Sequence, residues 1–116
     1  MTEKKRSNLE IRPATADDAA LILRFITDLA IYENAEDEVV ATESDIRESL
    51  FSHDSTASAV ICSNDQGPVG FAVYFFNYST WLGKNGLYLE DLYVAPEHRG
   101  TGAGFALLKH LAKIAV

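Results

Sequence analysis

The sequence predicts a single α/β domain of the α+β type, in which a mixed, mainly antiparallel sheet is flanked by helices. Its length of 116 residues suits one domain with a buried core. Apolar residues recur at helical spacing near both ends of the chain, whereas the middle contains nearly continuous apolar runs separated by turn residues. Such runs are typical of strands that are covered on both faces. The expected order of elements is β-α-α-β-β-β-α.

The N-terminal part predicts a short strand and a first helix. Residues 1–8 are polar and are expected to form a loose start, and the alternating residues 9–12 predict the strand. Thr15 followed three residues later by Asp18 resembles a capping box, which predicts a helix over residues 16–33. The apolar residues of this helix that recur at helical spacing are Ile22, Phe25, Ile26 and Leu29.

A second, shorter helix is expected after a stretch that is dense in carboxylates. Residues 32–38 fit a solvated helix end followed by a loop. Thr42 and Asp45 then repeat the capping pattern, and the helix that they begin is expected to end near residues 52–54. The apolar residues on one face of this helix are Ile46, Leu50 and Phe51.

The middle of the chain predicts three strands. Residues 57–62 and 69–76 are apolar runs joined by turn residues at 64–68, which predicts an antiparallel hairpin. Residues 77–86 contain two glycines and are expected to form a loop. The apolar run at residues 87–94 predicts the third of these strands.

The charge and the cysteine content limit the possible partners. A formal net charge of −7 argues against a general nucleic-acid binder and favours small cationic molecules. We expect no membrane association, because no apolar run approaches the roughly 20 residues that span a bilayer. The single cysteine, Cys62, excludes an internal disulfide and fits a cytoplasmic protein. No metal site is predicted, since the spacing of the histidines His53, His98 and His110 does not suit a metal.

A basic, glycine-rich loop precedes the last predicted helix, whose apolar residues extend nearly all round it. The beginning of a helix has unpaired N–H donors and a partial positive charge, so such a loop can hold a phosphate. A dinucleotide fingerprint would need a third glycine at the position of Phe105, and a P-loop would need Gly-Lys-Ser or Gly-Lys-Thr at its end. Neither motif fits. The pattern R-x-x-G-x-G does fit, at Arg99, Gly102 and Gly104.

This pattern resembles the acetyl-coenzyme A loop of the GNAT N-acetyltransferases. The resemblance extends from residue 9 to residue 116 and is nearest to the spermidine/spermine branch. It implies a GNAT fold, acetyl-coenzyme A as co-substrate, a homodimer, and an N-acetyltransferase domain at 9–116 without the C-terminal strands of that family. The tyrosine that usually protonates the departing thiolate in this branch has no counterpart here. The stretches that carry the resemblance to this branch are 11–16, 29–33, 69–76, 81–84 and 87–94.

The resemblance also implies a substrate and the residues that act on it. The expected substrate is a small polyamine or a lysine-like amine, whose ammonium has a pKa near about 10 and must lose a proton before it attacks. Glu90 is the candidate base, acting directly or through water. Regular strand alternation would point the side chains of Glu90 and Asp91 to opposite faces of the sheet. A salt bridge is the alternative for each of these two carboxylates. The predicted substrate-binding residues are Tyr32, Glu33, Glu90 and Asp91.

The remaining predicted site residues concern the cofactor. The strand before the loop is expected to offer its backbone to the pantetheine arm, as an added strand would. A non-catalytic module that binds coenzyme A or forms a dimer remains the alternative function. The predicted cofactor-binding residues are Leu92, Tyr93, Val94, Arg99, Gly100, Thr101, Gly102, Ala103, Gly104 and Phe105.

Overall fold

The computed structural model describes residues 9–80 and 83–115. The predicted loose start at 1–8 lies outside the described residues, as do positions 81 and 82 within the resemblance. The elements follow the predicted order, with short 3₁₀ helices at Ala16–Asp18, Glu36–Glu38 and Pro96–His98. They are β1 (Glu10–Pro13), α1 (Ala19–Tyr32), α2 (Glu43–Phe51), β2 (Ala57–Asn64), β3 (Gly67–Ser79), β4 (Lys84–Val94) and α3 (Ala103–Ala115).

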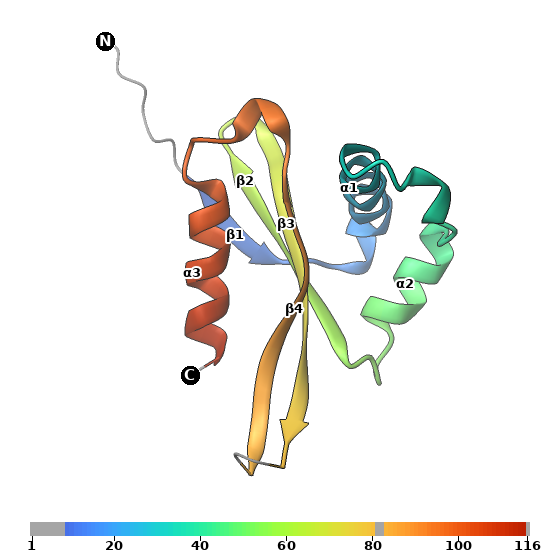
Figure 1. Ribbon diagram of the computed structural model, residues 1–116, viewed down its shortest axis with the longest axis vertical. Coiled ribbons are helices and arrows are strands. Elements are labelled where there is room, and N and C mark those ends of the chain that lie inside the picture. The colour runs from blue at the N-terminus through green and yellow to red at the C-terminus, as the bar shows by residue number, and fades with distance from the viewer. Residues whose placement is uncertain (1–8, 81–82, 116) are drawn as a thin grey trace.

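The sheet has the strand order β1-β2-β3-β4, and α3 covers one face while α1 and α2 cover the other (Figure 1). Each of the three strand pairings among the described residues is antiparallel. The mixed character expected from the sequence is therefore not seen in this part of the chain. The α+β architecture itself is confirmed.

Two buried clusters lie on the two faces of the sheet. Alternate residues of β2 enter different clusters: Ala59 and Ile61 face α1 and α2, while Val60 and Cys62 face α3. This alternation explains why the strand is apolar at nearly every position. The cluster beside α1 and α2 contains Ile22, Phe25, Ile46 and Phe71, and the cluster beside α3 contains Val69, Ala72, Leu107 and Leu111.

Both predicted capping signals are present. The Asp18 carboxylate accepts a hydrogen bond from the Thr15 backbone N–H at 2.7 Å. The Thr42 backbone N–H donates to the Asp45 carboxylate at 2.9 Å, and the Thr42 hydroxyl accepts from the Asp45 N–H at 3.1 Å. These bonds satisfy donors that the first turn of a helix leaves unpaired.

The prediction of a loop at residues 77–86 is wrong over most of this range. The β3 and β4 strands continue through it, with Asn77 opposite Gly86, and their paired ends project beyond the helices (Figure 1). The ring of Phe75 stacks on that of Tyr88 with centroids 5.6 Å apart. A cross-strand aromatic pair of this kind stabilises the strand pairing next to this segment.

A β-bulge interrupts β4 at Glu90. Val73 pairs with Asp91, whereas the next residue of β3 pairs with Leu89, so Glu90 has no partner across the ladder. Leu87 and Leu92 both pack with the cluster beside α3, although they are an odd number of positions apart. Regular alternation would put them on opposite faces. The alternation predicted for this strand is therefore wrong at Glu90.

Candidate functional site

The segment between β4 and α3 forms the predicted glycine loop. Gly100 and Gly102 have φ angles of 84° and 92°, which glycine adopts without the strain that a side chain would bring. The Thr101 hydroxyl donates to the His98 carbonyl oxygen at 2.6 Å and braces the turn. The Ala106 N–H donates to the Gly102 carbonyl oxygen at 2.9 Å, so the preceding N–H groups of α3 have no intrahelical acceptor.

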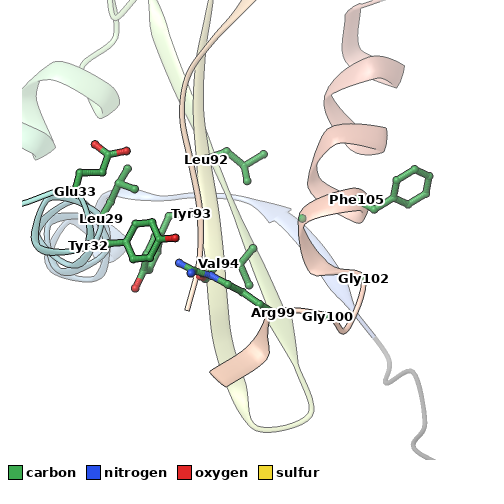
Figure 2. A pocket seen from close by; sticks show the side chains of 11 residues that line it. Leu29, Tyr32, Glu33, Leu92, Tyr93, Val94, Arg99, Gly100, Gly102 and Phe105 are labelled. Atoms are coloured by element: carbon green, nitrogen blue, oxygen red, sulfur yellow. The ribbon is translucent and has the colours of Figure 1, made fainter. Parts of the chain in front are cut away.

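A cavity of about 530 Å³ lies between this loop, the end of β4 and the C-terminal end of α1 (Figure 2). We call it the loop cavity. A Cβ atom added at Gly100 or Gly102 would meet no heavy atom within 4 Å, so open space adjoins the backbone there. The residues that line the loop cavity are Leu29, Tyr32, Glu33, Leu92, Tyr93, Val94, Arg99, Gly100, Gly102, Gly104 and Phe105.

Arg99 reaches from the glycine loop toward the end of α1 (Figure 2). Its Nε donates to the Val94 carbonyl oxygen at 2.8 Å. The guanidinium carbon lies 4.7 Å from the ring centroid of Tyr32 and 5.6 Å from that of Tyr93. Both are within the range of a cation–π contact, so two aromatic rings and one carbonyl oxygen hold this side chain.

The Tyr93 hydroxyl lies among negative charges as well as beside Arg99. Burial is the main cause that raises the pKa of Tyr93, and the negative charges of Asp28 and Glu97 raise it further. The positive charge of Arg99 opposes this effect. Tyr93 is 5% exposed and packs with Phe25, with ring centroids 5.8 Å apart. Its ring is therefore part of the core as well as part of the cavity wall.

A second cavity, of about 170 Å³, adjoins the loop cavity and shares Leu29 and Glu33 with it. We call it the small cavity. Asp91 lines it, and burial is the main cause that raises the pKa of Asp91, followed by the negative charges of Glu90 and Glu33. Asp91 consequently holds a proton more readily than an ordinary aspartate. The lining residues of the small cavity are Ile26, Leu29, Ala30, Glu33, Ala35, Glu38, Val39 and Asp91.

The structure brings most of the predicted site residues together. Every predicted cofactor-binding residue except Thr101 and Ala103 lines the loop cavity, as do Tyr32 and Glu33 from the predicted substrate set. Ala103 is buried beneath the loop. Leu29 lines both cavities and is not among the predicted site residues, because its spacing fitted the apolar face of α1.

Glu90 lies apart from these residues. It is exposed at the bulge, and it lines neither of the two cavities described here. Its position one residue before Asp91 places it near the small cavity rather than beside the glycine loop. The catalytic role expected for Glu90 stays a prediction.

The loop cavity fits an anionic ligand of the coenzyme A type. Backbone N–H groups at the start of α3, open space beside the glycines and the positive charge of Arg99 are the features that bind a diphosphate. Among the described residues, no group of three or more His, Cys, Asp or Glu is placed to hold a metal ion. None of the described helices has the length and apolar character needed to cross a membrane.

Comparisons with known proteins identify the family of this chain. The sequence pattern that describes the Acetyltransferase (GNAT) family matches residues 24–116. Thialysine N-epsilon-acetyltransferase of Bos taurus is 42% identical over 114 residues, which cover 91% of this chain and 66% of that protein. Spermidine/spermine N(1)-acetyltransferase-like protein 1 of Homo sapiens is 38% identical over 123 residues, which cover 100% of this chain and 18% of that protein. The chain thus spans just under two thirds of the length of the bovine relative.

A solved structure shows the same fold. Ribosomal-protein-alanine N-acetyltransferase from Brucella melitensis biovar Abortus 2308 superposes with a TM-score of 0.73 at 22% identity, covering 91% of this chain and 70% of that chain. The likeness at this identity concerns the fold alone. The sequence match over residues 24–116 identifies the relationship, and this range includes the glycine loop and α3. The chain belongs to the GNAT acetyltransferase family.

Proposed function

We propose that this chain transfers the acetyl group of acetyl-coenzyme A to a primary amine of a small polyamine or a lysine-like amine. The observation that carries the proposal is one cavity lined both by the glycine loop and by Glu33. An anionic donor and a cationic acceptor can therefore approach each other in the same space. The names of the thialysine and spermidine/spermine relatives point to the same class of acceptor.

The loop and β4 provide what the donor requires. The first N–H groups of α3 and the guanidinium of Arg99 would bind the diphosphate. β4 is the last strand in the order of the described sheet, so its outer edge can pair with the amide groups of a pantetheine arm. Acetyl-coenzyme A would supply an activated thioester carbonyl.

Carboxylates near the loop cavity provide what the acceptor requires. Glu33 and Asp91 would attract an ammonium group, and Glu90 would take its proton directly or through water. As the new C–N bond forms and the C–S bond breaks, the amine loses one proton and the thiolate gains one. The exposed position of Glu90 at the bulge fits transfer through water better than direct contact.

Calorimetry and a thiol-release assay test the proposal on the chain of 116 residues. We expect coenzyme A to bind and thiol to be released with thialysine, spermidine or another diamine. Gly102→Val should abolish measurable binding, because a β-branched residue is strained at a φ of 92° and its side chain would enter the open space beside the loop. Binding without turnover would favour a coenzyme A-binding module, and no binding would refute the proposal.

Glu90→Gln tests the proposed base separately. We expect turnover to fall about 100-fold, with the greatest loss at low pH, where more of the amine is protonated. Affinity for coenzyme A should change little, since Glu90 does not line the loop cavity. Rates across pH 6 to 9, measured at saturating acetyl-coenzyme A, provide the comparison. A wild-type rate at every pH would exclude a role of Glu90 in proton transfer.

A further inference from the structure

The side chain of Arg99 is held by aromatic rings and a carbonyl oxygen rather than by a carboxylate. Its Nε donates to the Val94 carbonyl oxygen, and its guanidinium lies over the rings of Tyr32 and Tyr93. Arg99 takes no part in the ion pairs found among the described residues. Arg24 also has no ion pair among the described residues and lies over the Phe25 ring, but Arg99 differs from it in lining the loop cavity.

Aromatic rings fix a guanidinium without neutralising it. A carboxylate partner would cancel the positive charge, whereas a ring attracts a cation through its quadrupole and has no net charge. The charged residues that line the loop cavity are Arg99 and Glu33, so Arg99 supplies the positive charge there. Because it is held in this way, the guanidinium keeps both its position and its charge for an anion that enters the cavity.

The two rings differ in what else they do. Tyr93 is 5% exposed and belongs to the core cluster beside α1 and α2, so its packing explains its presence. Tyr32 is 64% exposed and is the last residue of α1. The contact that its ring makes with Arg99, at 4.7 Å, links the end of α1 to the glycine loop. Core packing therefore does not account for Tyr32.

We infer that Tyr32 is a positioning residue for the anionic part of the cofactor and that it acts through Arg99. The inference rests on the proposed function, since it concerns the binding of coenzyme A in the loop cavity. It moves Tyr32 from the amine-binding set expected from the sequence to the cofactor side of the site. The neighbouring Glu33 lines both cavities and remains in the predicted amine-binding set.

Calorimetric titration with coenzyme A compares three variants of the chain. Tyr32→Leu removes the ring and should weaken coenzyme A binding about two- to fivefold, the range of an exposed cation–π contact. Tyr32→Phe keeps the ring and should bind as the wild type does. Tyr78→Leu is the matched control, because Tyr78 is 60% exposed and lines neither cavity. It should leave the affinity unchanged.

A double-mutant cycle tests whether Tyr32 acts through Arg99. In an Arg99→Gln background, Tyr32→Leu should cause no further loss of affinity, because the guanidinium that the ring holds is absent. The KM for the amine, measured at saturating acetyl-coenzyme A, should be the same for Tyr32→Leu and the wild type. Thermal unfolding of each variant shows whether the chain remains folded.

The possible failures can be told apart. If the wild type binds coenzyme A and Tyr32→Leu binds it equally well, the inference is overturned and the proposed function stands. A raised KM for the amine with unchanged coenzyme A affinity would return Tyr32 to the amine side. A full Tyr32→Leu effect in the Arg99→Gln background would show that the ring acts independently of Arg99. No coenzyme A binding by the wild type would remove the function and the inference together.

Discussion

Two arginines in this molecule are held in contrasting ways. Arg12, at the end of β1, forms an ion pair with Asp18 through its two Nη atoms, at 2.8 and 2.9 Å. Arg99, in the loop cavity, lies over two tyrosine rings and donates to a carbonyl oxygen. A carboxylate whose side chain is 12% exposed balances the positive charge of Arg12, whereas no ion pair among the described residues includes Arg99.

This contrast separates a cation that holds the fold together from one that is available to a ligand. Asp18 also accepts hydrogen bonds from the Thr15 N–H and hydroxyl, so the Arg12 pair joins β1 to the start of α1. Both oxygens of the Asp18 carboxylate therefore accept hydrogen bonds from within the protein. Among the described residues, Arg99 donates a hydrogen bond through Nε and lies over two tyrosine rings, which leaves its Nη donors for a ligand.

Loss of Arg12 should have the largest effect on stability. Arg12→Gln leaves the mostly buried Asp18 carboxylate without its cation, and we expect the free energy of unfolding to fall by about 2 kcal/mol. Urea denaturation measures this change. Arg47→Gln is the control, because it breaks an exposed pair with Glu43 one helical turn away and should cost about 0.4 kcal/mol. Equal losses in the two variants would contradict the structural role of Arg12.

Loss of Arg99 should affect ligand binding instead. Arg99→Gln removes the guanidinium, and we expect coenzyme A affinity to fall about tenfold, equivalent to about 1.4 kcal/mol. The free energy of unfolding should fall by about 1 to 2 kcal/mol, since two cation–π contacts and one hydrogen bond are lost. Arg12→Gln should leave the affinity unchanged. If Arg99→Gln unfolds more easily but binds coenzyme A with normal affinity, Arg99 has a structural role like that of Arg12.

Local patterns predicted the fold well where the structure depends on neighbouring residues. The Thr42 and Asp45 cap involves residues three apart, and spacing alone indicates such a pair. The bulge at Glu90 could not be predicted in this way, because it depends on which residues of β3 and β4 face each other. The continuation of both strands beyond residue 77 was missed for the same reason, since it depends on pairings such as that of Asn77 with Gly86 across two strands.

The same distinction between local patterns and long-range contacts applies to the site. The glycine loop is contiguous in the sequence, so its motif revealed it. The contact between Tyr32 and Arg99 joins residues far apart in the chain, and only the packing of α1 against β4 brings them together. The pairing of Arg12 with Asp18 was equally hidden, although the cap that contains Asp18 was predicted. Sequence thus indicated which residues form the loop but not which partners orient them.

Acid should reveal the Arg12 pair through a smaller effect. Arg12 holds the pKa of Asp18 at about 2, below its usual value of 3.8, mainly by hydrogen bonding. The charged pair therefore contributes stability that is fully present above the unfolded pKa, near pH 4, and is lost as the pH falls toward 2. Protonated Asp18 can still accept hydrogen bonds, so we expect this loss to be smaller than that of Arg12→Gln, about 1 kcal/mol.

Asp18→Asn isolates this titration from that of the other carboxylates, because asparagine can still accept the bond from the Thr15 N–H. The difference in unfolding free energy between the wild type and this variant should be constant from pH 7 to pH 5. It should then shrink between about pH 4 and pH 2, because the wild type alone loses the charged pair. A difference that stays constant down to pH 2 would mean that the carboxylate of Asp18 contributes only as a neutral acceptor, and the contrast with Arg99 would then rest on geometry rather than on charge.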